Sequence, residues 1–244
     1  MEAIHLEKEI FNRYQAVCER VELAAQRVGR RPEEVRVVVV TKTHPVELIR
    51  SVINAGAMHL GENYAEEAVG KMDLLGKAPG LHWHMIGHVQ SRKATWVAER
   101  FDWLHSLDSL KLARRISRFA SQAERSMPVL MECNVSGEES KFGWPAWLEG
   151  SWAELLDPFG EVLELPGLEI RGLMTMAPFL PDPEQARPYF KRLKKLQGYL
   201  AANLPRADWS ELSMGMSADF EVAVEEGASW VRVGTAITGS RVEE

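Results

Sequence analysis

The 244-residue sequence is poor in cysteine, in long apolar runs and in clustered positive charge. Its two cysteines, Cys18 and Cys133, are too few for a disulfide framework and lack a metal-type spacing, so we expect reduced thiols. The longest strongly apolar run, residues 35–41, contains Arg36 and is far too short to cross a bilayer. The first ten residues carry charges throughout, unlike the apolar core of a signal peptide. We therefore expect a cytoplasmic protein.

The sequence also lacks a basic block. Its formal net charge is -6, from 29 Lys and Arg against 35 Asp and Glu. This balance argues against nucleic acid as the main partner, and nothing in the sequence indicates membrane binding. A small anionic ligand remains compatible with it, because local geometry rather than net charge captures such a ligand.

Apolar periodicity predicts a long N-terminal helix followed by alternating strands and helices. Residues 1–28 repeat apolar side chains at helical spacing, and Gly29 and Pro32 end this helix. Eight strand-like segments follow, at residues 36–41, 57–60, 82–86, 102–105, 128–134, 169–174, 210–213 and 230–233. Helix-like segments lie between them, at residues 46–55, 63–75, 90–100, 108–124, 144–156, 184–203 and 217–226. This alternation favours an α/β fold, a closed (β/α)8 barrel of the TIM type, over an open doubly wound sheet.

The chain shows no linker rich in Pro, Gly or Ser, so we expect residues 1–244 to form a single domain. Residues 157–167 and 178–188 are predicted loops. Asn63 and Ser217 each precede a helix-like segment and are predicted to cap it. Three tryptophans without another interpretation are predicted to pack against the core: Trp144, Trp147 and Trp152.

One lysine stands where barrel enzymes carry their reactive groups, at the carboxyl end of a strand. Lys42 follows four valines and Thr41 at the end of the first predicted strand. Desolvation at the edge of an apolar interior favours the neutral amine, which is the form that attacks an aldehyde. The alternative is a lysine that extends from the strand end to solvent.

Two later strand ends carry the small and hydroxyl residues of a phosphate site. Ser217 closes the segment Ser-Met-Gly-Met-Ser after the seventh strand, and Gly234 and Thr235 follow the eighth. Barrel enzymes commonly bind phosphate in these two loops through backbone N–H groups and hydroxyls. A reactive Lys42 facing such a cradle describes a Schiff-base site for a phosphorylated aldehyde.

Other polar residues allow two interpretations each. Asn63 follows the second strand and is either a donor to a bound ring or a helix cap. His82 and His84 share one face of the third strand, a pattern that can bind zinc. No third ligand accompanies the pair, so we expect core or rim histidines and no metal site.

The order of its motifs makes the chain resemble the pyridoxal phosphate homeostasis protein family. That family is similar to the N-terminal barrel of alanine racemase, which is fold-type III for pyridoxal 5′-phosphate (PLP). The resemblance covers about residues 8–241. Its carriers are VVVVTKTHP, HLGENYAEE, LHWHMIGHVQSRK, FDWLHSLDS, VLMECNVSGEESKFG, IRGLMTMAP and ELSMGMSADFEVAVEEGASWVRVGTAITGSR.

The resemblance implies that Lys42 holds PLP as a Schiff base. It also implies which residues surround the cofactor. Ser217, Gly234 and Thr235 would lie at the phosphate, Arg232 would lie at the pyridine nitrogen, and Asn63, Met214 and His84 would lie beside the pyridine ring. Two positions depart from the family's pattern. Arg92 stands where Asn is usual, and Thr238 where Phe is usual. Both are expected at or beyond the rim of the site.

These residues favour a carrier over a catalyst. A cationic Arg232 disfavours protonation of the pyridine nitrogen, and an unprotonated ring is a weaker electron sink. Alanine racemase takes a second base from an additional C-terminal β domain. We expect this chain to lack that domain, because the sequence ends about ten residues after the last predicted strand. None of its four tyrosines is well placed to replace that base.

We therefore expect a monomeric PLP-binding protein of vitamin B6 homeostasis, with little or no catalysis, that passes the cofactor to apo-enzymes. Two alternatives stay open. One is a PLP-dependent amino-acid racemase that uses Lys42 alone, and the other is a cofactor-free Schiff-base aldolase.

Overall fold

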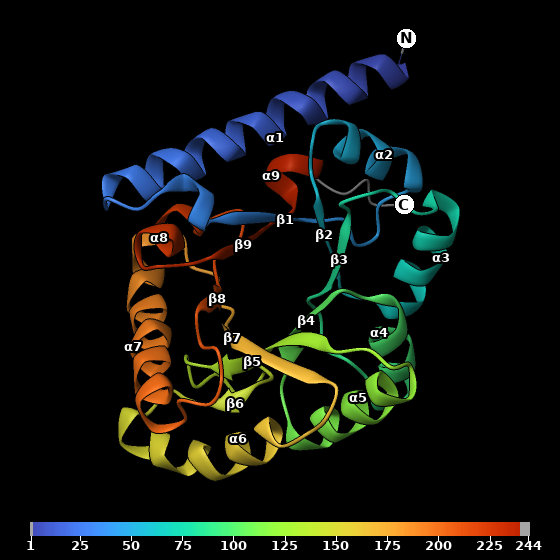
Figure 1. The fold of residues 1–244 in the computed structure, drawn as a ribbon. Coiled ribbons are helices and arrows are strands. Elements are labelled where there is room, and N and C mark those ends of the chain that lie inside the picture. The colour runs from blue at the N-terminus through green and yellow to red at the C-terminus, as the bar shows by residue number, and fades with distance from the viewer. Residues whose placement is uncertain (1, 240–244) are drawn as a thin grey trace.

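The structure, a computed structural model, describes residues 2–239 and is built around a closed barrel of parallel strands (Figure 1). Each strand pairs in parallel with its neighbours, and pairing of β4 with β5 closes the ring. The barrel strands are β1 Arg36–Val40, β2 His59–Glu62, β3 His82–Met85, β4 Trp103–Leu107, β5 Met127–Asn134, β7 Leu168–Met174, β8 Glu211–Ser213 and β9 Trp230–Val233. The two-residue strand β6, Trp144–Pro145, extends the sheet beside β5. The predicted closed barrel and all eight predicted strands are therefore confirmed.

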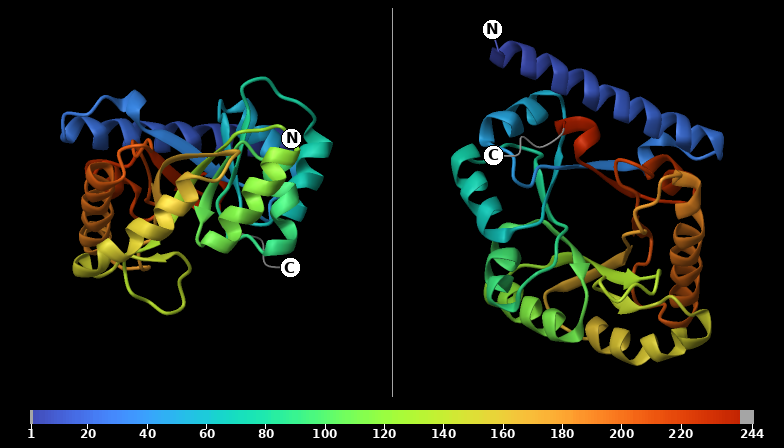
Figure 2. Two further views of the ribbon diagram at one scale, coloured as in Figure 1. Left: turned by 60° about the horizontal axis from the view of Figure 1, so that its bottom comes forward. Right: turned by 180° about the vertical axis from the view of Figure 1, so that it is seen from behind.

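Helices form the outer layer around the barrel (Figures 1 and 2). They are α1 Glu2–Arg27, α2 Val46–Asn54, α3 Ala65–Leu75, α4 Ala94–Arg100, α5 Leu110–Gln122, α6 Leu156–Leu163, α7 Arg187–Asn203, α8 Phe220–Glu225 and α9 Thr235–Thr238. Four 3-10 turns join them: η1 Pro32–Glu34, η2 Ser91–Lys93, η3 Glu149–Leu155 and η4 Pro183–Ala186. Within residues 2–239, no helix combines the length and the apolarity that a membrane crossing requires.

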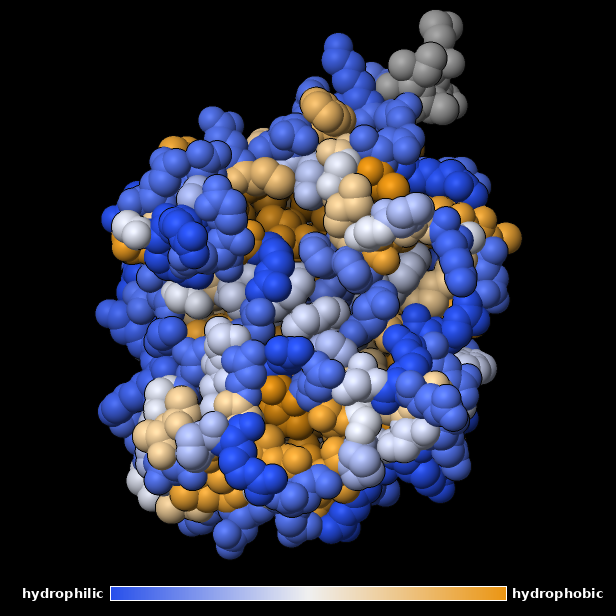
Figure 3. Space-filling model, in the orientation of Figure 1, coloured by the Kyte–Doolittle hydropathy of each residue, from blue (hydrophilic) through white to orange (hydrophobic). Residues whose placement is uncertain are grey.

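The N-terminal helix α1 lies outside the ring and packs against α2, α8 and α9 (Figure 1). It buries Ile10, Val17 and Val21 on the side that faces the barrel. Its remaining surface is largely polar and contributes to the mostly hydrophilic face in Figure 3, where apolar side chains gather in two areas inside the helical ring. This helix therefore covers the junction between the start and the end of the barrel.

The prediction for the segment after β5 is wrong. Residues 144–156 were expected to form a helix and 157–167 a loop, but α6 begins at Leu156 and runs through the predicted loop. Pro158 lies in the first turn of α6, where a proline removes no helical hydrogen bond and is tolerated. Trp144 and Trp152 are buried as expected, whereas Trp147 is half exposed.

The predicted helix caps are also wrong. Asn63 and Ser217 stand before the first helical turns, and the N-cap positions of α3 and α8 are Tyr64 and Asp219. Asn63 and Ser217 are therefore placed on the loops that follow β2 and β8, at the carboxyl end of the barrel. Their side chains are available for a site there.

Candidate functional site

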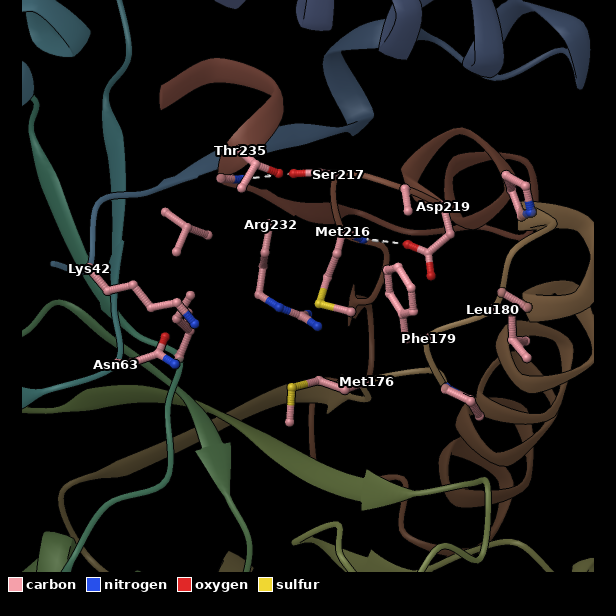
Figure 4. A pocket seen from close by; sticks show the side chains of 17 residues that line it. Lys42, Asn63, Met176, Phe179, Leu180, Met216, Ser217, Asp219, Arg232 and Thr235 are labelled. Carbon is pink, nitrogen blue, oxygen red and sulfur yellow. Dashed lines mark hydrogen bonds between the residues drawn. The ribbon is translucent and has the colours of Figure 1, made fainter. Parts of the chain in front are cut away.

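A cavity of about 330 Å³ opens at the carboxyl ends of the strands. Most of its lining comes from the loops that follow β1, β2, β3, β7, β8 and β9. Lys42 and Asn63 lie on one side, Met176, Phe179 and Leu180 lie across from them, and Arg232 lies between (Figure 4). The site thus joins polar groups to an apolar wall, which is typical of small-molecule sites.

Lys42 lies in the turn just after β1, and its side chain extends into the cavity beside Asn63 (Figure 4). The backbone of this turn is held on both sides of the lysine. The Thr41 hydroxyl donates to Glu62 Oε1 at 2.7 Å, and the Thr43 N–H donates to Glu67 Oε1 at 2.6 Å. Thr43 has a φ of 64°, in the left-handed region that a branched side chain rarely adopts. The bond to Glu67 helps to stabilise this conformation, which directs Lys42 inward.

A buried lysine joins these two carboxylates. Lys71 Nζ lies 2.7 Å from Glu62 Oε1 and 2.6 Å from Glu67 Oε1, and it donates to the Thr41 carbonyl at 2.7 Å. Burial raises the pKa of Glu62, and the positive charge of Lys71 opposes that rise. The ion pair therefore lies directly behind the Lys42 turn and fixes its neighbours on β2 and α3.

The loop after β8 and the start of α9 bring hydroxyl and backbone donors together. Ser217 Oγ accepts hydrogen bonds from the N–H groups of Gly234, at 3.2 Å, and Ala236, at 3.5 Å. Thr235 lines the cavity beside them. Gly215 has a φ of 92°, and a Cβ there would stand 2.5 Å from the Ala223 Cβ, so only glycine allows this loop to approach α8.

Arg232 on β9 is almost fully buried at the floor of the cavity. Its Nη1 donates to Ser213 Oγ at 2.6 Å, and its Nη2 donates to the Thr175 carbonyl at 2.9 Å. Desolvation lowers the pKa of Arg232 to about 10, and the charges of Asp219 and Glu132 oppose that shift. The guanidinium therefore keeps its positive charge at neutral pH.

Six of the eight predicted site residues line this cavity: Lys42, Asn63, Ser217, Arg232, Gly234 and Thr235. Met214 and His84 are not among the residues that line it. Both side chains are fully buried. Met214 packs in the core between barrel and helices, and Met216, two residues further along the loop, lines the cavity instead. His84 points into the barrel interior, where it hydrogen-bonds other histidines.

The apolar wall was not predicted as part of the site. Pro178, Phe179, Leu180 and Pro183 belong to the segment 178–188, which the sequence identified only as a loop, and Met176 lies just before it. Phe179 is 87% exposed at the rim, an unusual exposure for an aromatic side chain. The available signal was Met176 itself, which follows the buried Met174 on the same face of the extended chain.

The two departures from the family's pattern lie in different surroundings. Arg92 is exposed, whereas Thr238 is buried and donates to the Gly234 carbonyl.

Comparisons with known proteins agree with this architecture. The family model for the alanine racemase N-terminal domain matches residues 13–242. The pyridoxal phosphate homeostasis protein of Aquifex aeolicus is 40% identical over 229 residues, which cover 94% of this chain and 97% of that one. The protein of the same name from Pseudomonas aeruginosa is 42% identical over 230 residues, covering 92% and 93%. The chain belongs to the pyridoxal phosphate homeostasis protein family.

Solved structures with the same fold superpose on the barrel. PipY of Synechococcus elongatus with PLP bound has a TM-score of 0.78 and 36% sequence identity, covering 91% of this chain and all of that one. PipY without PLP gives a TM-score of 0.79 at 37% identity, covering 91% and 99%. Alanine racemase of Clostridium difficile has a TM-score of 0.69 but only 12% identity, over 94% of this chain and 56% of that one, so it shares the fold alone.

Proposed function

We propose that this protein binds PLP as a Schiff base on Lys42 and acts in PLP homeostasis and supply. One observation carries the proposal: Lys42 extends into the same cavity that Ser217, Gly234, Thr235 and Arg232 line. A primary amine and a set of anion donors in one pocket match the aldehyde and the phosphate of PLP. The relatives named for pyridoxal phosphate homeostasis and PipY with PLP bound support the same ligand.

The donors present suit the phosphate group. Ser217 and Thr235 each supply a hydroxyl. Gly234 and Ala236 supply backbone N–H groups, which donate hydrogen bonds to Ser217 Oγ in this structure. A phosphate oxygen can take the place of that acceptor, because hydroxyls and N–H groups both donate strongly to anions. Asn63 lies beside Lys42 and completes the polar side of the cavity.

Arg232 is the residue that restrains catalysis in this proposal. Bound PLP supplies an electron sink, which is strongest when its ring nitrogen is protonated. A guanidinium facing that nitrogen disfavours its protonation, since two cations would then lie side by side. We accordingly propose a carrier with little or no turnover, acting as a monomer in the cytoplasm and passing PLP transiently to apo-enzymes.

Chemical trapping tests this proposal. The protein is incubated with PLP, reduced with borohydride and digested, and the labelled peptide is located by mass spectrometry. We expect the label on Lys42, and we expect Lys77→Ala, a control at an exposed lysine outside the cavity, to be labelled like the parent. A label on another lysine would contradict the site.

Solvent exchange separates carrier from catalyst. Amino acids are incubated with the PLP-loaded protein in D2O, and deuterium at their α-carbon is followed by NMR. A carrier predicts exchange no faster than with free PLP. Rapid exchange that disappears in Lys42→Ala would favour the racemase alternative instead.

A further inference from the structure

A continuous chain of hydrogen bonds runs through the barrel interior and ends on Arg232. His59 Nδ1 lies 3.0 Å from His84 Nε2, and His84 Nδ1 lies 2.9 Å from His105 Nε2. His105 Nδ1 lies 2.8 Å from Ser213 Oγ, which accepts from Arg232 Nη1 at 2.6 Å. The chain thus joins β2, β3, β4, β8 and β9 from the amino end of the barrel to the floor of the cavity.

This chain occupies a place that barrels usually fill with branched apolar side chains. His84, His105 and Ser213 are fully buried, and only His59 is partly exposed. Two tryptophans enclose the imidazoles. The ring of Trp103 is stacked on that of His84 with 6.0 Å between ring centroids, and the ring of Trp230 is tilted against His84 with 5.0 Å between ring centroids. Buried polar groups are unfavourable unless their partners are in place, so a fully connected chain here indicates a role beyond packing.

Burial also fixes the charge of the imidazoles. Desolvation lowers the pKa of His84 and of His105, and neighbouring histidines and arginines lower it further. Burial lowers the pKa of His59 to about 4, with His82 and Arg36 contributing. Each ring is therefore neutral at pH 7, with one N–H donor and one nitrogen acceptor.

Neutral rings give the chain a single direction. Ser213 Oγ accepts from Arg232, so its own proton is directed to His105 Nδ1. His105 then carries its proton on Nε2 and donates to His84 Nδ1, and His84 donates from Nε2 to His59 Nδ1. Every donor points away from Arg232, and hydrogen bonds aligned in this way strengthen one another. Ser213 Oγ consequently becomes a stronger acceptor for the guanidinium.

We propose that Ser213 and His105, supported by His84 and His59, are positioning residues that hold Arg232 in one orientation toward the PLP ring. Together with the Thr175 carbonyl, Ser213 engages both terminal nitrogens of the guanidinium. The side chain therefore cannot rotate away from the floor of the cavity. The inference rests on the proposed function, because PLP is the group on which the orientation of Arg232 acts.

The first test needs no cofactor. Histidine side chains are labelled with ¹⁵N, and the imidazole shifts of the PLP-free protein are recorded at pH 7. We expect His84 and His105 to be neutral with the proton on Nε2, and their N–H protons to exchange slowly with water. A cationic His105, or one with its proton on Nδ1, would overturn the proposal whether or not PLP binds.

The second test uses a matched pair of variants at His105. His105→Leu removes the acceptor for the Ser213 hydroxyl, whereas the Oδ1 of Asn in His105→Asn can stand where Nδ1 stood. We expect the Leu variant to shift the absorption maximum of bound PLP more than it changes the Kd for PLP, and the Asn variant to restore the parent's absorption maximum. Ser213→Ala, a smaller change, is expected to reproduce the shift seen with Leu.

The outcomes separate this inference from the proposed function. If the Leu and Ala variants bind PLP with the parent's spectrum and affinity, the chain does not position Arg232. If the Leu, Ala and Asn variants all weaken PLP binding and none of them shifts the spectrum of bound PLP, the hydrogen-bonded chain is merely structural. If the parent develops no Lys42-dependent band, the proposed function fails, while the imidazole shifts still decide whether the chain has the direction described.

Discussion

Removal of the hydroxyls of Ser217 and Thr235 should weaken the retention of PLP while the barrel stays folded. Each hydroxyl is expected to donate one hydrogen bond to the phosphate dianion. Such a bond contributes about 1–3 kcal/mol, which corresponds to about a 5- to 160-fold rise in Kd for each hydroxyl removed. The double variant Ser217→Ala, Thr235→Ala should therefore bind PLP more than about 30-fold more weakly than the parent.

The cost to folding should be small by comparison. In this structure Ser217 Oγ accepts two long hydrogen bonds, at 3.2 and 3.5 Å, from the N–H groups of Gly234 and Ala236. Gly234 lines the cavity and both residues are partly exposed, so water can replace the lost acceptor. We expect Ser217→Ala to lower the free energy of unfolding by no more than about 1 kcal/mol.

The assay is a PLP titration followed by absorbance, beside urea unfolding of the PLP-free proteins. Thr238→Val provides the control: it also removes a hydroxyl from α9, but one that bonds the Gly234 carbonyl and does not line the cavity. This control should retain PLP like the parent. A double variant that holds PLP as tightly as the parent would refute the assigned phosphate cradle.

Three further predictions concern the charged and titratable groups of the barrel. Arg232→Ala should change the absorption spectrum of bound PLP more than its Kd, and an unchanged spectrum would remove Arg232 from the ring nitrogen. Lys71→Met leaves the buried Glu62 carboxylate without its cation and should lower the free energy of unfolding in urea by about 3–5 kcal/mol; a loss below about 1 kcal/mol would contradict the role of this pair. The pKa of His84 is lower in the folded protein than its unfolded value of about 6.5, so below that pH only the unfolded chain binds a proton at this site. The parent should therefore lose about 1.4 kcal/mol more stability per pH unit than His84→Gln as the pH falls below about 6, and equal slopes would disprove a neutral His84.

The sequence predicted the barrel well because the pattern that specifies it is local. The valines of residues 37–40 are buried or half-buried in β1, as their continuous apolarity indicated. Lys42, Ser217 and Thr235 line one cavity because they lie in loops that follow strands whose carboxyl ends meet at one rim. Position after a strand end was therefore sufficient to predict that they lie together.

Features that depend on side-chain direction or on distant contacts were not predictable in the same way. Met214 and Met216 are alike in sequence, and only the path of the loop after β8 decides which one reaches the cavity. The links between His59, His84 and His105 depend on the register of three separate strands. The position of α6 was predicted wrongly because Pro158, which lies in its first turn, was interpreted as part of a loop.

The central claim is that Lys42 holds PLP, and the visible absorption spectrum of the purified protein with PLP tests it most directly. The parent and the control Lys77→Ala should both develop a yellow band distinct from free PLP, and Lys42→Ala should not. A band of equal strength in Lys42→Ala, or its absence from the parent, would contradict the account.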